Sequence, residues 1–188
     1  MNGLASFMKD QDRHSRPTEN RQVGLCNSVV DCATLTSVTL CPTFWAGLGG
    51  GLSVLLSAIG AGIGIGISGP AIAGAGVERP EVMFKTFIAT ILAEALAIYG
   101  LVVGLLSVFH ITDALTLAGS VRIFAGGLTM GAAALGAGFG IGTSGSALAA
   151  ATAEKPEIFS RAVITLILAE ALAIYALVTA LLLVLQAS

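Results

Sequence analysis

From about Phe44 onward, the chain consists of long apolar segments separated by short polar connections. We place these segments near residues 45–76, 82–109, 118–152 and 158–186. Each reaches the roughly 20 residues that a helix needs to cross a bilayer. The pattern predicts an all-α membrane protein with four transmembrane helices. The first and third segments exceed one crossing, so we expect them to tilt or to extend beyond the membrane.

The second half of this apolar region repeats the first half without a gap. Corresponding residues lie 76 positions apart (170 − 94 = 76), as in the pairs Gly60–Gly136, Gly64–Gly140, Ser68–Ser144, Pro80–Pro156, Glu94–Glu170 and Tyr99–Tyr175. Each repeat is one helical hairpin, which we place at residues 44–109 and 118–186. Since the repeats are parallel rather than inverted, they argue against the inverted-repeat designs of secondary transporters.

Residues 1–43 precede the hairpins and are polar, mixed in charge and without periodicity. They lack the apolar core of a signal peptide, so we expect a flexible extension. An alternative is that they are not native, and that translation starts near Val38 or Leu40. An odd number of cysteines fits a disulfide framework poorly, and no second Cys or His cluster suggests zinc. We therefore expect no metal site and an incidental role for Cys26, Cys32 and Cys41.

The composition agrees with a membrane protein. The chain is 55% hydrophobic and 11% charged, whereas a soluble domain carries about 25% charged residues. The net charge is −2, and the absence of a basic patch with interleaved aromatic residues argues against nucleic acid as a partner. Both hairpin turns are charged, with Glu78, Arg79, Pro80 and Glu81 in the first and Glu154, Lys155, Pro156 and Glu157 in the second.

Positive charge near the helix ends predicts the orientation in the membrane. Arg79, Lys85, Lys155 and Arg161 gather at the two turns, whereas the middle connection at residues 110–120 is poor in Lys and Arg. Because cytoplasmic loops are richer in these residues, we expect both turns to lie in the cytoplasm. The termini and the middle connection then lie outside.

Both first helices carry alternating glycines, in "GAGIGIGISG" (60–69) and "GAGFGIGTSG" (136–145). No Lys-Ser/Thr follows and no strand precedes, which argues against a phosphate-binding loop. In a membrane helix, small residues four apart allow close backbone approach. We therefore expect these helices to pack tightly, as in the inner layer of a ring. The packing glycines are Gly60, Gly62, Gly64, Gly66, Gly136, Gly138, Gly140 and Gly142.

One glutamate stands in the middle of each second helix, Glu94 in the first hairpin and Glu170 in the second. An ionised side chain at the bilayer centre costs at least about 2.5–3.5 kcal/mol. No Lys or Arg lies within eight residues of either acid, so we expect each to be protonated where it faces lipid. A buried structural acid is one interpretation, but a duplicated intramembrane acid favours a reversible proton or cation site. We expect neither glutamate to catalyse the formation or cleavage of a covalent bond.

Several other groups are candidate partners of the acids. Folding the hairpins about residues 79 and 155 places Glu94 level with Gly64 (158 − 94 = 64) and Glu170 level with Gly140 (310 − 170 = 140). The nearby hydroxyls belong to Ser68, Thr143 and Ser144. Tyr99 and Tyr175 follow each acid by five residues, where they join a local network or serve as interfacial anchors.

Two glycine-rich hairpins with "LAEALAIYG" at 92–100 and "LAEALAIYA" at 168–176 resemble the proteolipid rotor subunit (K or c) of A-type and V-type ATPases over about residues 45–186. The resemblance implies a homo-oligomeric ring whose turns face the cytoplasm and the central stalk. Each glutamate would carry one ion past a stator subunit that supplies an arginine and two half-channels. The chain itself would be a non-catalytic subunit without a cofactor.

Two details refine this expectation. Many vacuolar-type relatives keep one acid, whereas both are present here, which favours the archaeal-type, synthase-capable branch or a bacterial relative. Alanine and leucine flank both acids and no Gln lies inside the helices. Because hard cations need several oxygens, protons are favoured, while nearby hydroxyls leave sodium open. A four-helix channel, a secondary transporter and a structural scaffold are the alternatives outside this family.

Overall fold

A computed structural model describes residues 41–112 and 114–187, and every regular element within them is helical. The elements are α4 (Pro42–Glu78), α5 (Pro80–Thr86), α6 (Ile88–Phe109), α7 (Leu117–Glu154), the short 3₁₀ helix η1 (Pro156–Ile158) and α8 (Phe159–Leu185). Four stretches are long and apolar enough to cross a membrane, at 42–78, 80–109, 117–154 and 156–185. The all-α prediction with four membrane helices is confirmed. Most of the expected extension at 1–43 lies outside the described residues.

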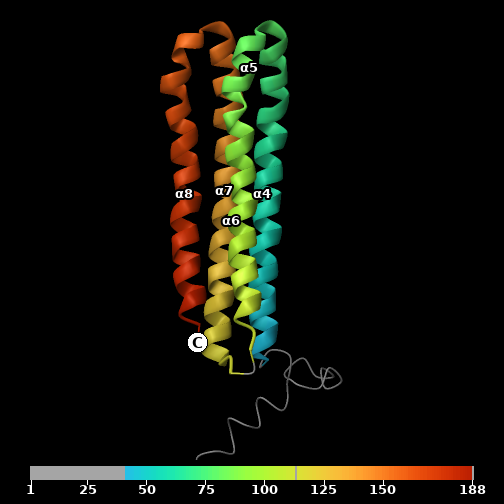
Figure 1. Cartoon of the computed structure of the whole chain (residues 1–188), viewed down its shortest axis with the longest axis vertical. Helices are drawn as coiled ribbons and strands as arrows, with labels where there is room; N and C mark the ends of the chain where they lie inside the picture. The colour runs from blue at the N-terminus through green and yellow to red at the C-terminus, as the bar shows by residue number, and fades with distance from the viewer. Residues whose placement is uncertain (1–40, 113, 188) are drawn as a thin grey trace, which may run out of the picture.

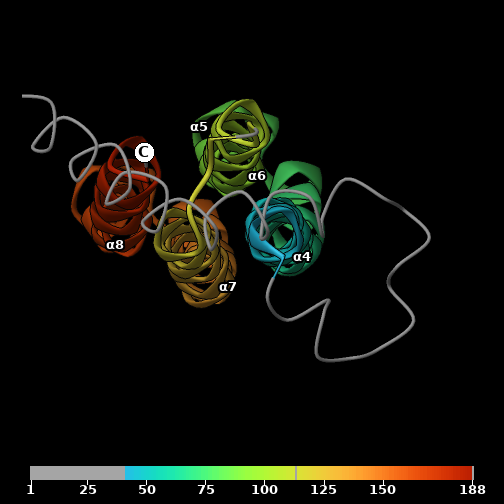
Figure 2. The same cartoon turned by 90° about the horizontal axis from the view of Figure 1, so that it is seen from below.

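The helices run side by side along the long axis of the molecule (Figure 1). Seen from the end, α4 and α7 form one layer, and α6 and α8 form a second layer (Figure 2). Helix α6 contacts both α4 and α7, whereas α8 contacts α7 and, less extensively, α6. Each hairpin therefore contributes one helix to each layer.

Each hairpin turns at a charged residue that precedes a proline. Arg79 (φ −142°, ψ 94°) and Lys155 (φ −136°, ψ 95°) are both extended, because the proline ring disfavours the helical conformation of the residue before it. Pro80 and Pro156 then occupy the first turn of the next helix, where the missing N–H costs no hydrogen bond. The turns are thus encoded locally, once in each repeat.

The first helix of each hairpin is longer than a bilayer crossing requires. Helices α4 and α7 have 37 and 38 residues, or about 55 Å at 1.5 Å per residue. The hydrocarbon core is about 30 Å thick. Both helices are therefore longer than one perpendicular crossing, and whether they tilt or extend past the membrane stays a prediction.

Glycine allows α4 and α7 to meet backbone to backbone. A Cβ atom on Gly138 would overlap the carbonyl of Gly60, and one on Gly60 would overlap the carbonyl of Ala134. A second approach nearer the middle connection involves Gly127 and the carbonyl of Gly49. The tight packing that we expected from the glycine stripes is present, but not at every glycine. Gly62, Gly66 and Gly136 have nothing within 4 Å of such a Cβ.

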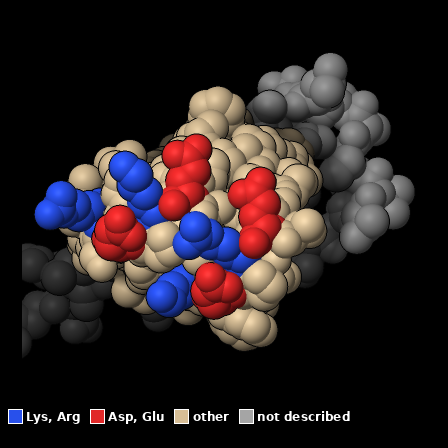
Figure 3. All heavy atoms as spheres, turned by 90° about the horizontal axis from the view of Figure 1, so that it is seen from above, with Lys and Arg blue, Asp and Glu red and all other residues tan. Residues whose placement is uncertain are grey.

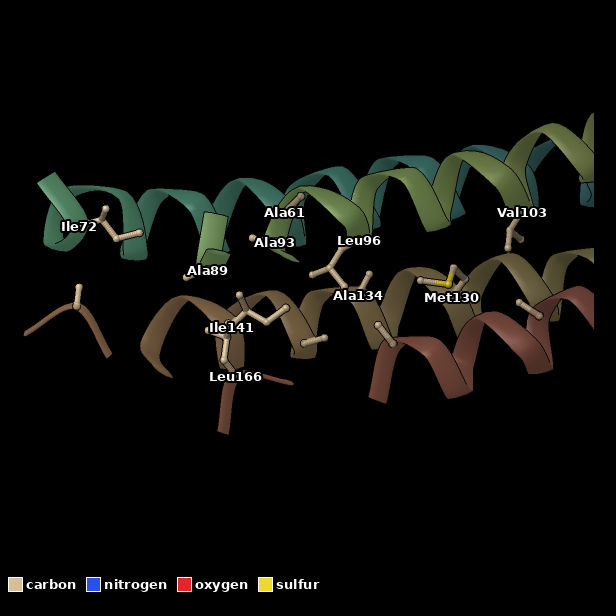
Figure 4. Packing of buried hydrophobic residues seen from close by; sticks show 14 of the residues in the cluster. Ala61, Ile72, Ala89, Ala93, Leu96, Val103, Met130, Ala134, Ile141 and Leu166 are labelled. Carbon is tan, nitrogen blue, oxygen red and sulfur yellow. The ribbon is translucent and has the colours of Figure 1, made fainter. Parts of the chain in front are cut away.

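Small and large apolar residues together fill the space between the two layers. Ala93 and Leu96 of α6 point toward α7, where they approach Ala134 and Ile141 (Figure 4). All four are fully or almost fully buried and belong to one continuous core cluster. The outward faces instead carry large apolar side chains such as Leu168 and Leu172, more than 60% exposed. A lipid environment suits this distribution, since water would leave a large apolar surface solvated.

At the end opposite the turns, one hydrogen bond joins α7 to the residue that follows α8. Arg122 Nη1 of α7 donates to the carbonyl of Gln186, 2.8 Å away, just after α8. Cys41, which precedes α4, is disulfide-bonded. For Cys41, the incidental role that we expected is therefore wrong, because counting an odd number of cysteines does not exclude one bonded pair. Cys26 and Cys32 lie outside the described residues.

The glycine contacts predict unequal effects of two matched substitutions on α7. Gly138→Ala should destabilise the single chain by about 1–3 kcal/mol, the usual cost of overpacking, because its Cβ would meet the Gly60 backbone. Gly136→Ala adds the same methyl group where nothing lies within 4 Å and should remain within about 0.5 kcal/mol. Thermal unfolding of the dissociated chain in detergent measures both. Equal destabilisation by the two variants would contradict the packing described above.

Candidate functional site

The acid of the second hairpin lies between α6 and α8. Glu170 is 9% exposed, and its Oε1 accepts a hydrogen bond of 2.9 Å from the Tyr99 hydroxyl of α6. The donor belongs to the first hairpin and the acceptor to the second. Of the candidate partners, Tyr99 is therefore the one that the structure brings to an acid. The two hairpins build this site together.

The acid of the first hairpin has a different environment, although its local sequence is almost the same. Glu94 of α6 is exposed in the single chain. Tyr175 of α8 is 67% exposed, so the described residues place it in the open rather than beside an acid. The two copies of the motif thus adopt one buried and one open arrangement.

Both acids lie at the middle of their membrane spans. Glu94 is 14 residues after Pro80 and 15 before Phe109, and Glu170 has the same spacing from Pro156 and Leu185. The alanine before each acid contacts the glycine stripe. A Cβ on Gly64 would lie 2.8 Å from Ala93 Cβ, and one on Gly140 would lie 3.2 Å from Ala169 Cβ. The depth match from the hairpin fold is thus accurate to about one residue.

The other candidate hydroxyls satisfy their own helices. Ser68 Oγ donates to the Gly64 carbonyl at 2.8 Å, and Ser144 Oγ donates to the Gly140 carbonyl at 2.7 Å. Thr143 Oγ1 bonds to the Phe139 and Gly140 carbonyls at 3.0 and 3.2 Å. Bonds of this kind to a carbonyl one turn earlier leave the hydroxyl little reach toward another helix. The structure brings none of these three groups into a hydrogen bond with Glu94 or Glu170.

Sequence reasoning missed the residues that hold α6 against α4 beside this site. Ser53 Oγ of α4 donates to the carbonyl of Gly100 at 3.0 Å, next to Tyr99. A Cβ on Gly100 would overlap the Ser57 side chain, and one on Gly104 would lie 2.6 Å from Val54. A sequence signal was present, since Gly100 and Gly104 form a further pair of small residues four apart. Their effect is to fix the helix that presents Tyr99.

The turn end of the molecule is charged, in contrast to the site. Seen from above, acidic and basic side chains alternate over this end (Figure 3). All are exposed. They are Glu78, Arg79, Glu81, Lys85, Glu154, Lys155, Glu157 and Arg161. The two prolines of the turns, Pro80 and Pro156, lie among them. This mixed surface is suited to water and to polar protein partners, not to the bilayer core.

Comparison with known proteins gives one consistent result. The family of the ATP synthase C subunit matches residues 48–107 and again 124–183, and the two matches are offset by the same 76 positions (124 − 48 = 76). The chain is 40% identical over 141 residues to the 16 kDa proteolipid c-type subunit of the V-type proton ATPase of Rattus norvegicus, covering 75% of this chain and 91% of that protein. It is 35% identical over 152 residues to the corresponding V-type proton ATPase protein of Candida tropicalis, covering 79% and 95%. It is also 35% identical over 156 residues to the 16 kDa proteolipid of Ascaris suum, covering 81% and 96%.

The Tyr99–Glu170 hydrogen bond predicts a selective effect of Tyr99→Phe. Loss of the hydroxyl frees a carboxyl oxygen of Glu170, so labelling of Glu170 by a hydrophobic carbodiimide should be faster. We expect a change of about 2- to 10-fold, which matches the 0.5–1.5 kcal/mol of a typical hydrogen bond. Mass spectrometry of labelled peptides measures Glu170 and Glu94 in one sample, with Glu94 as the internal control. An unchanged Glu170 rate would show that the bond does not shield this acid.

Proposed function

This chain belongs to the family of the ATP synthase C subunit, and we propose that it is a rotor subunit of a rotary ATPase that carries protons on Glu94 and Glu170. The observation that supports this most is the Glu170 carboxyl, held at mid-membrane by a single tyrosine hydroxyl. One neutral hydrogen bond stabilises a protonated acid in a bilayer and leaves it able to release its proton. The V-type proton ATPase subunits among its relatives support the same role.

The chain acts as a non-catalytic part of a larger assembly. Its relatives are named as proteolipid subunits of V-type proton ATPases, which supports assembly into a ring within the membrane. The layered arrangement of two parallel hairpins also favours a ring (Figure 2), because further hairpins can be added by the same rotation. ATP chemistry then belongs to other subunits, and this chain transmits ion movement as rotation.

Protons suit the site better than sodium. A desolvated Na⁺ would need several oxygen ligands, as hard cations do. In the described structure, the carboxyl of Glu170 meets a hydroxyl that donates to it, while Ser68, Thr143 and Ser144 bond to their own helices. A donor and a carboxyl suffice for a proton. The transported ion that we propose is therefore H⁺.

The charge distribution suggests how the rotor is oriented and what it contacts. The described residues carry four Lys and Arg at the turn end and Arg122 at the other end. The positive-inside rule then places the turns in the cytoplasm, where they contact the central stalk. The exposed faces of α6 and α8 pass a stator subunit, whose positively charged arginine pairs with each deprotonated acid in turn. Cys41, Ala187 and the middle connection then lie on the opposite side of the membrane.

Two acids in one chain bear on the direction of operation. If both carry protons, the ring moves two ions per chain in each turn. A higher ion number lowers the gradient that ATP synthesis requires. This favours a synthase-capable enzyme of the archaeal-type branch or a bacterial relative. Counting the subunits in an image of the isolated ring would give the ion-to-ATP ratio.

Substituting either carrier tests the function directly. Glu170→Gln keeps the size and polarity of the side chain but removes the titratable proton, so ATP-driven acidification of membrane vesicles should be lost. Glu94→Gln should have the same effect, because every site must pass the stator. Glu157→Gln at the turn is the matched control and should retain transport. The ring should still be recovered intact from all three variants. Normal acidification by Glu170→Gln would exclude the proposed mechanism.

A competition experiment distinguishes the two ions. If the carriers bind protons, sodium chloride at neutral pH should leave the rate of carbodiimide labelling at Glu94 and Glu170 unchanged. Potassium chloride at equal ionic strength is the control for screening. Selective protection of either glutamate by sodium would reassign that site to Na⁺.

A further inference from the structure

The helix that presents Tyr99 to Glu170 makes a second hydrogen bond one residue further along the chain. The Gly100 carbonyl of α6 accepts a bond of 3.0 Å from Ser53 Oγ of α4. Ser53 is fully buried, so this bond lies inside the first hairpin. Helix α6 is therefore bonded to α4 at residue 100 and to α8 at residue 99.

These two bonds constrain the same movements of α6. Each residue of a helix advances 1.5 Å along the axis and about 100° around it, so residues 99 and 100 move together as one rigid unit. A hydrogen bond weakens steeply when its angle falls below about 120°. A rotation or slide of α6 that carried Tyr99 away from Glu170 would therefore also strain the bond from Ser53.

Ser53 differs from the other fully buried serines of this interface. In a helix, a serine often satisfies its hydroxyl at a carbonyl one turn earlier, as Ser107 does at the Val103 carbonyl, 2.7 Å away. Ser57 packs against Gly100, and its Oγ has no hydrogen-bond partner among the described residues. Of these three serines, Ser53 is the one that donates to the neighbouring helix.

The second hairpin is built differently at the equivalent positions. The counterpart of Ser53 is Thr129 (53 + 76 = 129), whose Oγ1 donates to a carbonyl of its own helix at 2.7 Å. The counterpart of Gly100 is Ala176, and the tyrosine before it, Tyr175, is 67% exposed. The serine bond between helices thus accompanies the tyrosine that meets an acid within the chain.

Close packing fixes the separation of α4 and α6 more firmly than it fixes their rotation. A Cβ on Gly100 would overlap the Ser57 side chain, which shows how closely the two helices approach. Apolar contacts have no preferred direction, whereas a hydrogen bond does. The bond from Ser53 supplies that direction at the residue next to Tyr99.

We propose that Ser53 is a positioning residue for the Glu170 site, because it holds the α6 backbone at the depth and rotation where the Tyr99 hydroxyl reaches the acid. Its effect on the acid passes through Gly100 and Tyr99. This inference rests on the proposed role of Glu170 as a proton carrier. It gives α4 a part in the site of the second hairpin, although α4 carries neither the acid nor its donor.

Carbodiimide labelling of the full-length chain in detergent tests this role. Ser53→Ala should raise the labelling rate of Glu170 about 2- to 10-fold, the range expected for one weakened hydrogen bond, and leave Glu94 unchanged. Ser57→Ala is the matched control, since it removes an equally buried hydroxyl that has no partner in the described structure, and should leave both rates unchanged. An unchanged Glu170 rate in Ser53→Ala, or an equal rise in both variants, would overturn the proposal.

A double variant separates positioning from a general loosening of the fold. If Ser53 acts through Tyr99, Ser53→Ala should not raise Glu170 labelling further once Tyr99→Phe has removed the hydroxyl. The same fold-increase in both backgrounds would show an effect independent of Tyr99 and would reject the positioning role. The two proposals fail separately: normal vesicle acidification by Glu170→Gln would reject the proton carrier, whereas these labelling rates bear on Ser53 alone.

Discussion

A carboxyl group at the middle of a membrane needs a polar partner, and this requirement organises the structure. Water is absent there, so an unsatisfied polar group costs several kcal/mol. Glu170 meets the requirement through Tyr99 of the other hairpin. Because donor and acceptor are on different hairpins, α6 and α8 must lie side by side in one fixed register. A slide of one helix by a single turn, 5.4 Å, would break the bond.

That register is set in the other layer. Helices α4 and α7 approach until the backbones of Gly60 and Gly138 are in contact. Helices α6 and α8 are then each positioned by the first helix of their own hairpin. Ala93 rests on Gly64, and Ala169 rests on Gly140. Glycine and alanine have no flexible side chain atoms that could adapt to a changed spacing. The small residues therefore determine the depth and separation of the acids with little freedom.

The turns, the two hairpins and the depth of the acids could be predicted from the sequence. The contacts between helix faces could not, for a physical reason. Proline after a charged residue marks both turns, the 76-residue repeat gives two hairpins, and hairpin folding gives the depth of Glu94 and Glu170. The sequence could not show which face of each helix meets which neighbour. Helices in lipid are apolar on all sides, so the periodicity that identifies the buried face of a soluble helix is weak. Interleaved stripes such as Gly60 and Gly62 therefore look equivalent until the chain is folded.

Joining two hairpins in one chain also allows their two interfaces to diverge. In a ring of identical hairpins, the same residue occupies a given position at every interface. Here Ile67 and Thr143 occupy equivalent positions in the two hairpins and differ. Ile67 lies within 3.0 Å of a Cβ added to Gly142, inside the chain. Thr143 is exposed and bonds to its own helix, on the side of α7 that carries Gly136. The contact between the two hairpins is thus apolar at this position, whereas the equivalent position on α7 exposes a hydroxyl. Duplication therefore allows the residues that join the two hairpins to differ from those at the equivalent exposed positions, because one substitution no longer changes both.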